Sequence, residues 1–214
     1  MDFLYTVVGF VQAGGAFMYP ILIVFAVGAA VAIERTVMLA RVRGKNRKVW
    51  DSLHPVMSEG NFDEARKLTS EDDSFISQLL GMGLAREGAV RRRDDIEIAM
   101  EESMMEIIPQ LEKRTPYVAL FANISTLLGL LGTIMGLIEA FTAVANANPA
   151  EKADLLSASI SVAMNTTAFG LMAAIPLLIT HTYLTSKTGE IIDSLEMASV
   201  KTLNIISESV KRQG

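Results

Sequence analysis

The sequence contains no cysteine and only two histidines, His54 and His181, in 214 residues. The absence of cysteine excludes disulfide bonds and thiolate metal ligands, and it leaves the redox compartment open. Two distant histidines do not form the ligand cluster that a metal site needs. The sequence also has no nucleotide-binding motif and no serine–histidine–aspartate set. It therefore predicts no metal, no cofactor and no enzymatic activity.

A strong excess of positive charge is also missing, because the net charge is -5. The run from Arg91 to Arg93 is followed at once by Asp94 and Asp95, so it is not a clean basic patch. The sequence therefore gives no reason to expect nucleic acid as a partner.

Charge is absent altogether from three long stretches, residues 3–33, 117–138 and 155–186. A helix needs about 20 mainly apolar residues to cross a hydrocarbon core of ~30 Å, and each stretch is long enough. The alternative is a large soluble helical protein, but its buried helices would seldom run this long without a charge. We therefore predict an all-α membrane protein with three transmembrane helices, and membrane lipid as its surroundings.

The first uncharged stretch is too long for one span, since at ~1.5 Å per residue it would extend well over 40 Å. Gly14, Gly15 and Pro20 suggest a break. We expect a short interfacial helix over residues 1–16, and a start with Asp2 and no basic residue argues against a cleaved signal peptide. The other expected segments are a first span (17–38), a cytoplasmic helical loop (39–115), a second span (116–144), a periplasmic hairpin (145–154), a third span (155–186) and a cytoplasmic C-terminal helix (187–214).

The orientation follows from the basic residues, which favour the cytoplasmic side of short loops. Most of them lie in residues 35–115, none precedes residue 17, and the hairpin has only Lys152. We therefore expect a periplasmic N-terminus and a cytoplasmic C-terminus.

The cytoplasmic segments show helical patterns. Residues 60–68 (GNFDEARKL) predict a short helix with Asn61 as its N-cap. Apolar residues recur at helical spacing before the second span and after the third, so both spans are expected to continue as long cytoplasmic helices, with Pro109 as a candidate kink. The two patterns are Ile96, Met100, Met104, Ile107, Ile108 and Leu111, and then Ile191, Ile192, Leu195, Ala198, Leu203, Ile206 and Val210.

The second span places Gly129, Gly132 and Gly136 in the apolar run LLGLLGTIMG. Small residues let helix backbones approach in lipid, where no hydrophobic force drives helices together. The third span offers matching small residues, including Gly170. These faces are predicted to be helix contacts and to favour packing of copies into a ring.

The third span is polar along one face, where Ser157, Ser161 and Asn165 are spaced by four residues. Two interpretations stay open for this stripe. It can form hydrogen bonds between helices, which the spacing favours, or it can line a wetted pathway.

Two segments of the chain resemble the MotA/TolQ/ExbB proton-channel family. They are LLGLLGTIMGLIEAF (residues 127–141) and SVAMNTTAFGLMAAIP (residues 161–176). The segments IERTVMLARVR (residues 33–43) and GNFDEARKL are also similar to the family, so the likeness covers nearly the whole chain. Three spans point to the ExbB/TolQ branch.

The resemblance implies a homo-pentamer in the bacterial inner membrane around an ExbD/TolR-like single-span partner that carries a transmembrane aspartate. Proton flow through the complex would be passed on as mechanical work. Thr133 and Thr167 match the pore threonines of the family, and Pro176 matches the proline after the third-span motif. Asn165 and Thr166, beside Thr167, are included in the expected proton pathway.

The chain departs from the family pattern at two places. Val162 stands where related proteins carry a glutamate, and Thr126 stands where they carry a proline. An intramembrane carboxylate would be the natural proton carrier, and the chain has none there. Glu139 and His181 lie near the ends of their spans, so each is interpreted as an interfacial residue rather than a proton relay.

A threonine hydroxyl does not titrate near neutral pH, but it can donate and accept hydrogen bonds. Thr133 is therefore expected to meet a titrating group of the partner, although a bond to a carbonyl of its own helix is the common alternative. The leading hypothesis is the channel subunit of a proton-driven motor. A non-conducting structural scaffold is the second hypothesis, and a substrate transporter is disfavoured because inverted repeats are absent.

Overall fold

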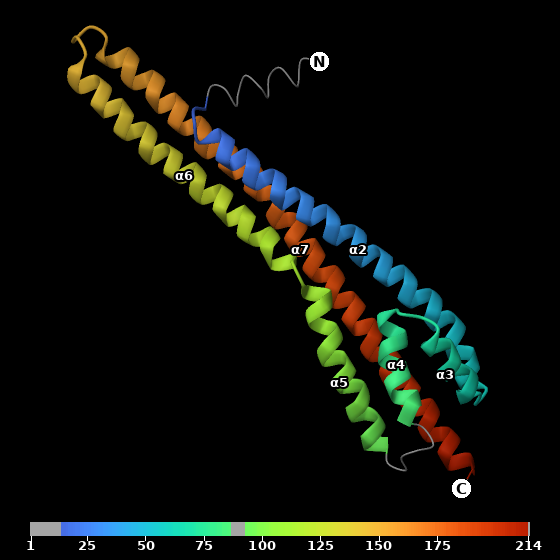
Figure 1. The fold of residues 1–214 in the computed structure, drawn as a ribbon. Coiled ribbons are helices and arrows are strands. Elements are labelled where there is room, and N and C mark those ends of the chain that lie inside the picture. Colours follow the sequence, from blue (N-terminus) through green and yellow to red (C-terminus); the bar gives the residue numbers. More distant parts are fainter. Residues whose placement is uncertain (1–13, 87–92, 214) are drawn as a thin grey trace, which may run out of the picture. The chain divides into compact units, whose positions relative to one another are not determined.

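The computed structural model describes residues 14–86 and 93–213, and it is helical throughout (Figure 1). The helices are α2 (Met18–Ser58), α3 (Phe62–Ser70), α4 (Phe75–Arg86), α5 (Arg93–Glu112), α6 (Thr115–Asn146) and α7 (Lys152–Gln213). The chain divides into unit 1, residues 1–34 and 114–183, and unit 2, residues 35–113 and 184–214. The helices α2 and α7 contribute to both units.

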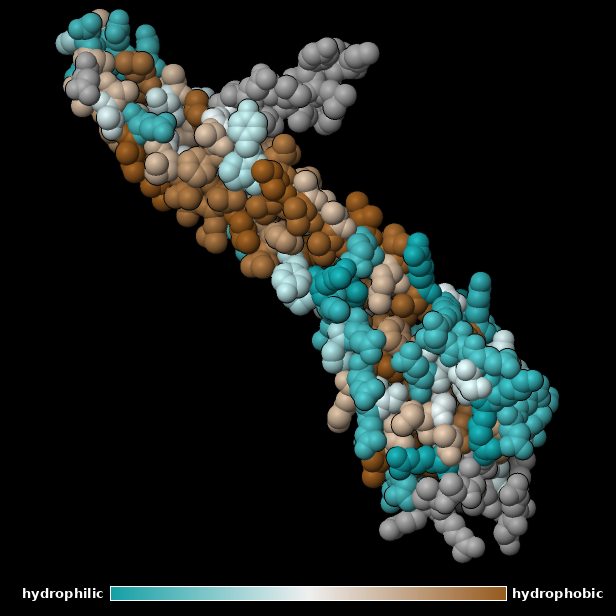
Figure 2. Space-filling model, viewed as in Figure 1, coloured by the Kyte–Doolittle hydropathy of each residue, from teal (hydrophilic) through white to brown (hydrophobic). Residues whose placement is uncertain are grey.

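Three helical segments of the described chain are long and apolar enough to cross a membrane, Met18–Ser58, Arg93–Ala145 and Lys152–Ser209. Only 17 to 33% of their most apolar windows is buried. Large apolar side chains therefore cover the outside of unit 1, which Figure 2 shows as a brown surface, whereas the visible face of unit 2 is mostly hydrophilic. This pattern is that of a protein in lipid. The exact ends of the three spans stay predictions.

The helix α2 begins after a turn at residues 14–17. Gly15 has a φ of 78°, a conformation that glycine adopts without steric cost, and its carbonyl accepts from the backbone N–H of Met18 across 3.2 Å. Pro20 lies in the first turn of the helix, where its missing N–H costs nothing. The predicted interfacial helix over residues 1–16 falls mostly outside the described residues and stays a prediction.

The chain breaks between α5 and α6. Arg114 has a φ of 67°, which is uncommon for a residue other than glycine, and Pro116 occupies the first turn of α6. The expectation that the second span continues as one cytoplasmic helix is therefore wrong, because Pro116 has no N–H to extend the hydrogen bonds of α5. Pro109 does not end α5, which runs through it to Glu112. The third span does continue, since α7 is a single helix of 62 residues.

Unit 1 is formed by the first part of α2, all of α6 and the first part of α7, which run side by side in Figure 1. Gly28 on α2 fits between the other two helices. A Cβ atom built on it would lie 2.9 Å from Cδ1 of Leu177 on α7 and 3.0 Å from Cβ of Phe121 on α6. Small buried side chains continue these contacts, namely Ala122, Ala140, Ala163, Ala173 and Ala174. Close backbone packing therefore holds the three helices of unit 1 together.

Unit 2 packs the remainder of α2 and α7 with α3, α4 and α5. Its core contains the residues that the helical patterns predicted, including Met100 and Ile107 on α5 and Leu195 on α7. Asn61 is the N-cap of α3, as predicted, and its side chain accepts from the N–H of Glu64 across 3.3 Å. The buried guanidinium of Arg35 donates to the carbonyl of Leu111 and so satisfies one of the last carbonyl groups of α5.

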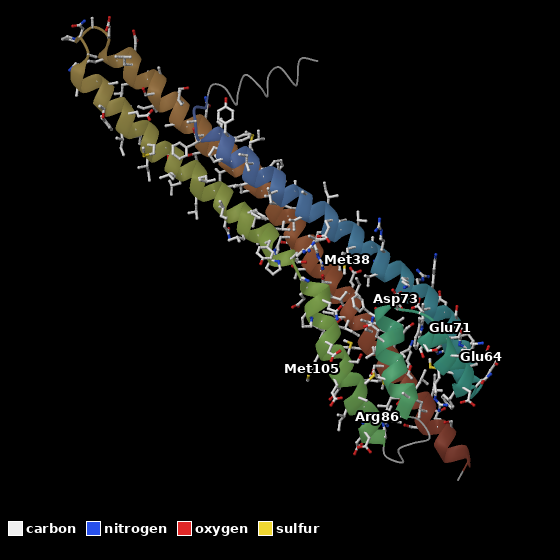
Figure 3. The ribbon with its side chains drawn as sticks, in the orientation of Figure 1. Met38, Glu64, Glu71, Asp73, Arg86 and Met105 are labelled. Atoms are coloured by element: carbon white, nitrogen blue, oxygen red, sulfur yellow. The ribbon has the colours of Figure 1, made fainter. Side chains whose placement is uncertain are left out.

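Side chains outside this core project from unit 2. Met105 on α5 is 72% exposed and points away from the neighbouring helices (Figure 3). Asp73 lies in the linker before α4, and its carboxylate pairs with the ammonium of Lys45 on α2. This ion pair ties the linker to α2.

Candidate functional site

The backbones of α6 and α7 approach closely at Gly129 and Gly170. A Cβ atom on Gly170 would lie 2.7 Å from the carbonyl oxygen of Ser125 and 3.0 Å from the Cα of Gly129. A Cβ atom on Gly129 would lie 3.3 Å from the Cα of Gly170. Because the nearby atoms belong to the backbone, they cannot turn aside as a side chain could. Glycine is therefore needed on both helices at this crossing.

The GxxxG pair of Gly132 and Gly136 faces the same partner helix. A Cβ atom on Gly132 would lie 2.3 Å from Cγ2 of Thr166, and one on Gly136 would lie 2.9 Å from Cβ of Ala163. These glycines therefore lie in a helix contact with the small residues of α7 within one chain, where α6 and α7 are antiparallel neighbours joined by a short hairpin. The packing of copies into a ring stays a prediction.

Two threonines of the predicted pathway donate to carbonyl groups of α6. The hydroxyl of Thr167 donates to the oxygen of Gly129 across 3.0 Å, and that of Thr133 donates to the oxygen of Leu130 across 2.6 Å. Both side chains are half-buried. Each hydroxyl has a single proton, so both oxygens keep their lone pairs and can act only as acceptors toward a further group.

Thr166 occupies a different environment from its neighbour. It is 2% exposed, and its hydroxyl lies 2.6 Å from the carbonyl oxygen of Gly14 and 3.0 Å from that of Val162. The side chain therefore ties α7 to the turn before α2, in the packed interior of unit 1. Sequence reasoning missed this contact, because the two residues are separated by 152 positions.

The polar stripe of α7 is not covered by α6. Ser157 and Ser161 are exposed, and Asn165 is half-buried. In hydrocarbon such groups need a partner or water, because an unsatisfied polar group there costs several kcal/mol. Pro176 is exposed on α7, where the hydroxyl of Thr180 donates to its carbonyl oxygen across 2.8 Å.

Ionisable side chains are scarce in unit 1. Between residues 115 and 183 the acidic and basic residues are Glu139, Glu151, Lys152 and Asp154, at or near the hairpin end, and His181, near the opposite end. Glu139 is exposed, and Val162, where the resemblance predicts a glutamate, is 38% exposed. The described chain therefore places no carboxylate level with Thr133 and Thr167, and no metal-binding cluster is found among the described residues.

The sequence that forms this glycine-packed helix pair, its hydroxyls and the polar stripe of α7 lies within a segment that matches a known family of membrane proteins. The model of the MotA/TolQ/ExbB proton channel family matches residues 71–197, more than half of the sequence. The chain belongs to this family. Its fold is all-helical with three candidate spans, and the family is of the channel type rather than an enzyme family.

Relatives support the ExbB/TolQ branch of the MotA/TolQ/ExbB family. An ExbB homolog of biopolymer transport from Methanothermobacter thermautotrophicus is 26% identical over 204 residues, which cover 94% of this chain and 71% of the relative. The Tol-Pal system protein TolQ of Haemophilus influenzae is 36% identical over 93 residues, 44% of this chain and 40% of the relative. The biopolymer transport protein exbB1 of Vibrio cholerae is 49% identical over 57 residues, 27% of this chain and 25% of the relative. The chain is thus a multi-pass inner-membrane protein of the ExbB/TolQ type.

Proposed function

We propose that the protein is the channel subunit of a proton-driven motor in the bacterial inner membrane. Five copies would surround the transmembrane helix of an ExbD/TolR-like partner, and proton flow would be passed on to the cell envelope as mechanical work. The N-terminus would be periplasmic and the C-terminus cytoplasmic. The ExbB and TolQ relatives support the type of partner.

The observation that carries this proposal is the hydrogen bonding of two half-buried threonine hydroxyls, those of Thr133 and Thr167. The protons of Thr133 and Thr167 are donated to α6 carbonyls, so their oxygens are acceptors without a competing carboxylate nearby in the chain. An acceptor stabilises a carboxyl group that is protonated, because only the protonated form donates. A neutral aspartate of the partner would fit this environment, and the ionised form would turn toward a wetter gap.

The uncovered face of α6 offers room for further helices. Its exposed apolar residues are Leu127, Leu130, Leu131, Ile134, Ile138 and Phe141. Since the glycine face of α6 is already filled by α7, these side chains are available to lipid, to neighbouring copies or to a central partner helix. This supports an assembly in which α6 and α7 move as one packed pair.

The test is proton flux into vesicles that contain the co-expressed complex. Thr133→Val and Thr167→Val keep the side-chain shape and remove the hydroxyl, so the complex should assemble and conduct poorly. Native mass spectrometry of the same samples should show five copies of the chain. Undiminished flux in both variants would contradict the hydroxyl role, and flux from the chain without a partner would contradict a partner carboxylate.

A non-conducting scaffold of an envelope or secretion complex is the second candidate. Val162 favours it, because an apolar side chain stands where related channels carry a glutamate. In that case the wild-type complex would assemble with its partner and show no proton flux above protein-free vesicles. The same vesicle experiment therefore separates the two functions.

A further inference from the structure

Unit 2 contains a cavity of about 280 Å³ between α2, α4 and α7. Three helices contribute to its wall, so the cavity does not depend on a flexible loop. This size is near the lower end of small-molecule sites in proteins. The lining residues are Arg43, Asn46, Arg47, Trp50, Ile76, Glu190, Ser194, Met197, Ala198 and Lys201.

The charge of the lining is mostly positive. Arg43, Arg47 and Lys201 face a single acidic residue, Glu190. Glu190 is already paired with Arg43 across 3.2 Å and with Lys187 across 2.5 Å. The hydrogen bond from Lys187 holds the pKa of Glu190 below its usual value, so Glu190 stays ionised and engaged with these two cations. The guanidinium of Arg47 has its Nε 4.0 Å from the carboxylate of Asp51 one turn along α2, which is the outer limit of an ion pair between two exposed side chains. Such a pair contributes little, so Arg47 can still attract an anion together with the ammonium of Lys201.

A buried amide in the same wall offers a donor to a ligand that accepts hydrogen bonds, as an anion does. Asn46 is 5% exposed, and its Oδ1 accepts from the backbone N–H of Ile76 across 3.4 Å. Because Oδ1 is the acceptor in this contact, the Nδ2 group of Asn46 is still a donor. Nδ2 has no hydrogen-bond partner among the described residues. A buried donor without a partner costs about 1–3 kcal/mol, so a ligand that accepts from it is favoured.

An apolar wall completes the cavity. Trp50 lines it beside Ile76, Met197 and Ala198, and the ammonium of Lys201 lies 6.0 Å from the centre of the Trp50 ring. The cation–π contact holds Lys201 near the cavity. The lining therefore offers cationic donors to an anion and an apolar surface to the remainder of a small ligand.

From this geometry we propose that the cavity of unit 2 binds a phosphate-bearing anion through Arg47, Lys201 and the amide of Asn46. Guanidinium groups match the oxygens of phosphate in geometry as well as charge. The site is distinct from Thr133 and Thr167, so it does not rest on the proposed proton pathway.

Such a phosphate has two sources, a lipid headgroup or a soluble phosphate compound. At ~1.5 Å per residue along α2, Arg47 lies about 13 Å beyond the predicted end of the first span at Met38. The headgroup layer extends only about 5–8 Å beyond the hydrocarbon core. The position therefore favours a soluble phosphate compound.

The test uses Trp50, which is the only tryptophan of the sequence and lines the cavity. Its fluorescence would be followed in the full chain in neutral detergent during titration with inorganic phosphate, pyrophosphate and glycerol 3-phosphate. Sodium chloride at matched ionic strength sets the baseline.

A parallel sample in nanodiscs compares phosphatidylcholine alone with a mixture that includes phosphatidylglycerol. We expect a saturable change with a soluble phosphate. A change confined to phosphatidylglycerol discs would support the site with a lipid as its source.

Arg47→Gln should raise Kd about tenfold, because a charge-assisted hydrogen bond is lost. The matched control is Lys48→Gln, which removes one charge from the same exposed part of α2 but does not line this cavity, and its Kd should equal that of the wild type. Thermal unfolding of both variants confirms that they are folded. The proposal is overturned by no saturable response to any phosphate or lipid, by an equal response to acetate, or by an unchanged Kd in Arg47→Gln.

Discussion

The hydroxyl of Thr167 on α7 donates to the carbonyl oxygen of Gly129 on α6 across 3.0 Å. Gly129 is also the residue whose Cα lies against Gly170, so the hydrogen bond and the close backbone crossing occupy the same level of unit 1. The contact couples a threonine of the proposed pathway to the packing of its helix pair. A change in the position of α7 would therefore move this hydroxyl relative to α6.

Loss of this bond should weaken the helix pair modestly. We expect Thr167→Val to lower the free energy of unfolding by about 1 kcal/mol, since hydrogen bonds between membrane helices contribute about 0.6 to 2 kcal/mol. Thr167→Ser keeps the hydroxyl and should lose less. Unfolding in mixed micelles, followed by circular dichroism, measures both. Equal stability of the two variants would show that the hydroxyl does not hold the helices together.

Gly170 and Gly189 form a matched pair on α7. Gly170→Ala would place a Cβ atom 2.7 Å from the carbonyl oxygen of Ser125, whereas a Cβ atom at Gly189 meets nothing within 4 Å. We expect Gly170→Ala to destabilise the protein by about 1–3 kcal/mol through overpacking. Gly189→Ala should be neutral or stabilising by up to about 1 kcal/mol, because alanine is the better helix former. Thermal unfolding in detergent compares them, and a similar shift for both would argue against the close crossing.

Asp72 should make the stability of unit 2 depend on acid pH. Burial acts to raise the pKa of Asp72, but hydrogen bonds from Ser74, Ser77 and Lys45 outweigh it and lower the pKa to about 2. A carboxylate whose pKa is lower in the folded state stabilises that state above its unfolded pKa, so this contribution is lost as the pH falls from about 4 to about 2. It amounts to about 2 kcal/mol at neutral pH.

Asp72→Asn should therefore be less stable than the wild type at pH 7, and the difference should shrink as the pH falls through this window. Unfolding of the full chain followed by circular dichroism at several pH values measures it. Asp73→Asn is the control, because the Asp73 side chain is 90% exposed and a smaller effect is expected. A difference between Asp72→Asn and wild type that stays constant down to pH 2 would rule out this role of the ionised carboxylate.

The orientation of the chain can be read with single cysteines, since the natural sequence has none. The basic loop predicts that position 58 is cytoplasmic and position 147 periplasmic. An impermeant maleimide applied to whole cells should label Ala147→Cys and leave Ser58→Cys unlabelled until the cells are opened. Labelling of position 58 but not of position 147 would contradict the predicted orientation.

The amino-acid sequence by itself determined the number and approximate place of the three spans. A run of about 20 apolar residues is long enough to cross the hydrocarbon core as a helix, and a helix satisfies its backbone hydrogen bonds within the run itself. The sequence also determined much of the core of unit 2, because Met100, Ile107 and Leu195 belong to apolar patterns that repeat at the spacing of helix turns. The glycines of the second span could be predicted to form a contact surface, with the small residues of the third span as its match, though not the individual residues that meet.

Only the tertiary structure decided where those surfaces are used. Gly132 and Gly136 meet α7 of the same chain, and Thr166 reaches Gly14, because folding brings together residues whose separation in sequence carries no periodic signal. The cavity around Asn46 likewise depends on contacts between α2, α4 and α7, not on a local pattern. The sequence shows which side chains carry a hydroxyl or an amide that can form hydrogen bonds. The packing of the surrounding helices decides which group each of them bonds to.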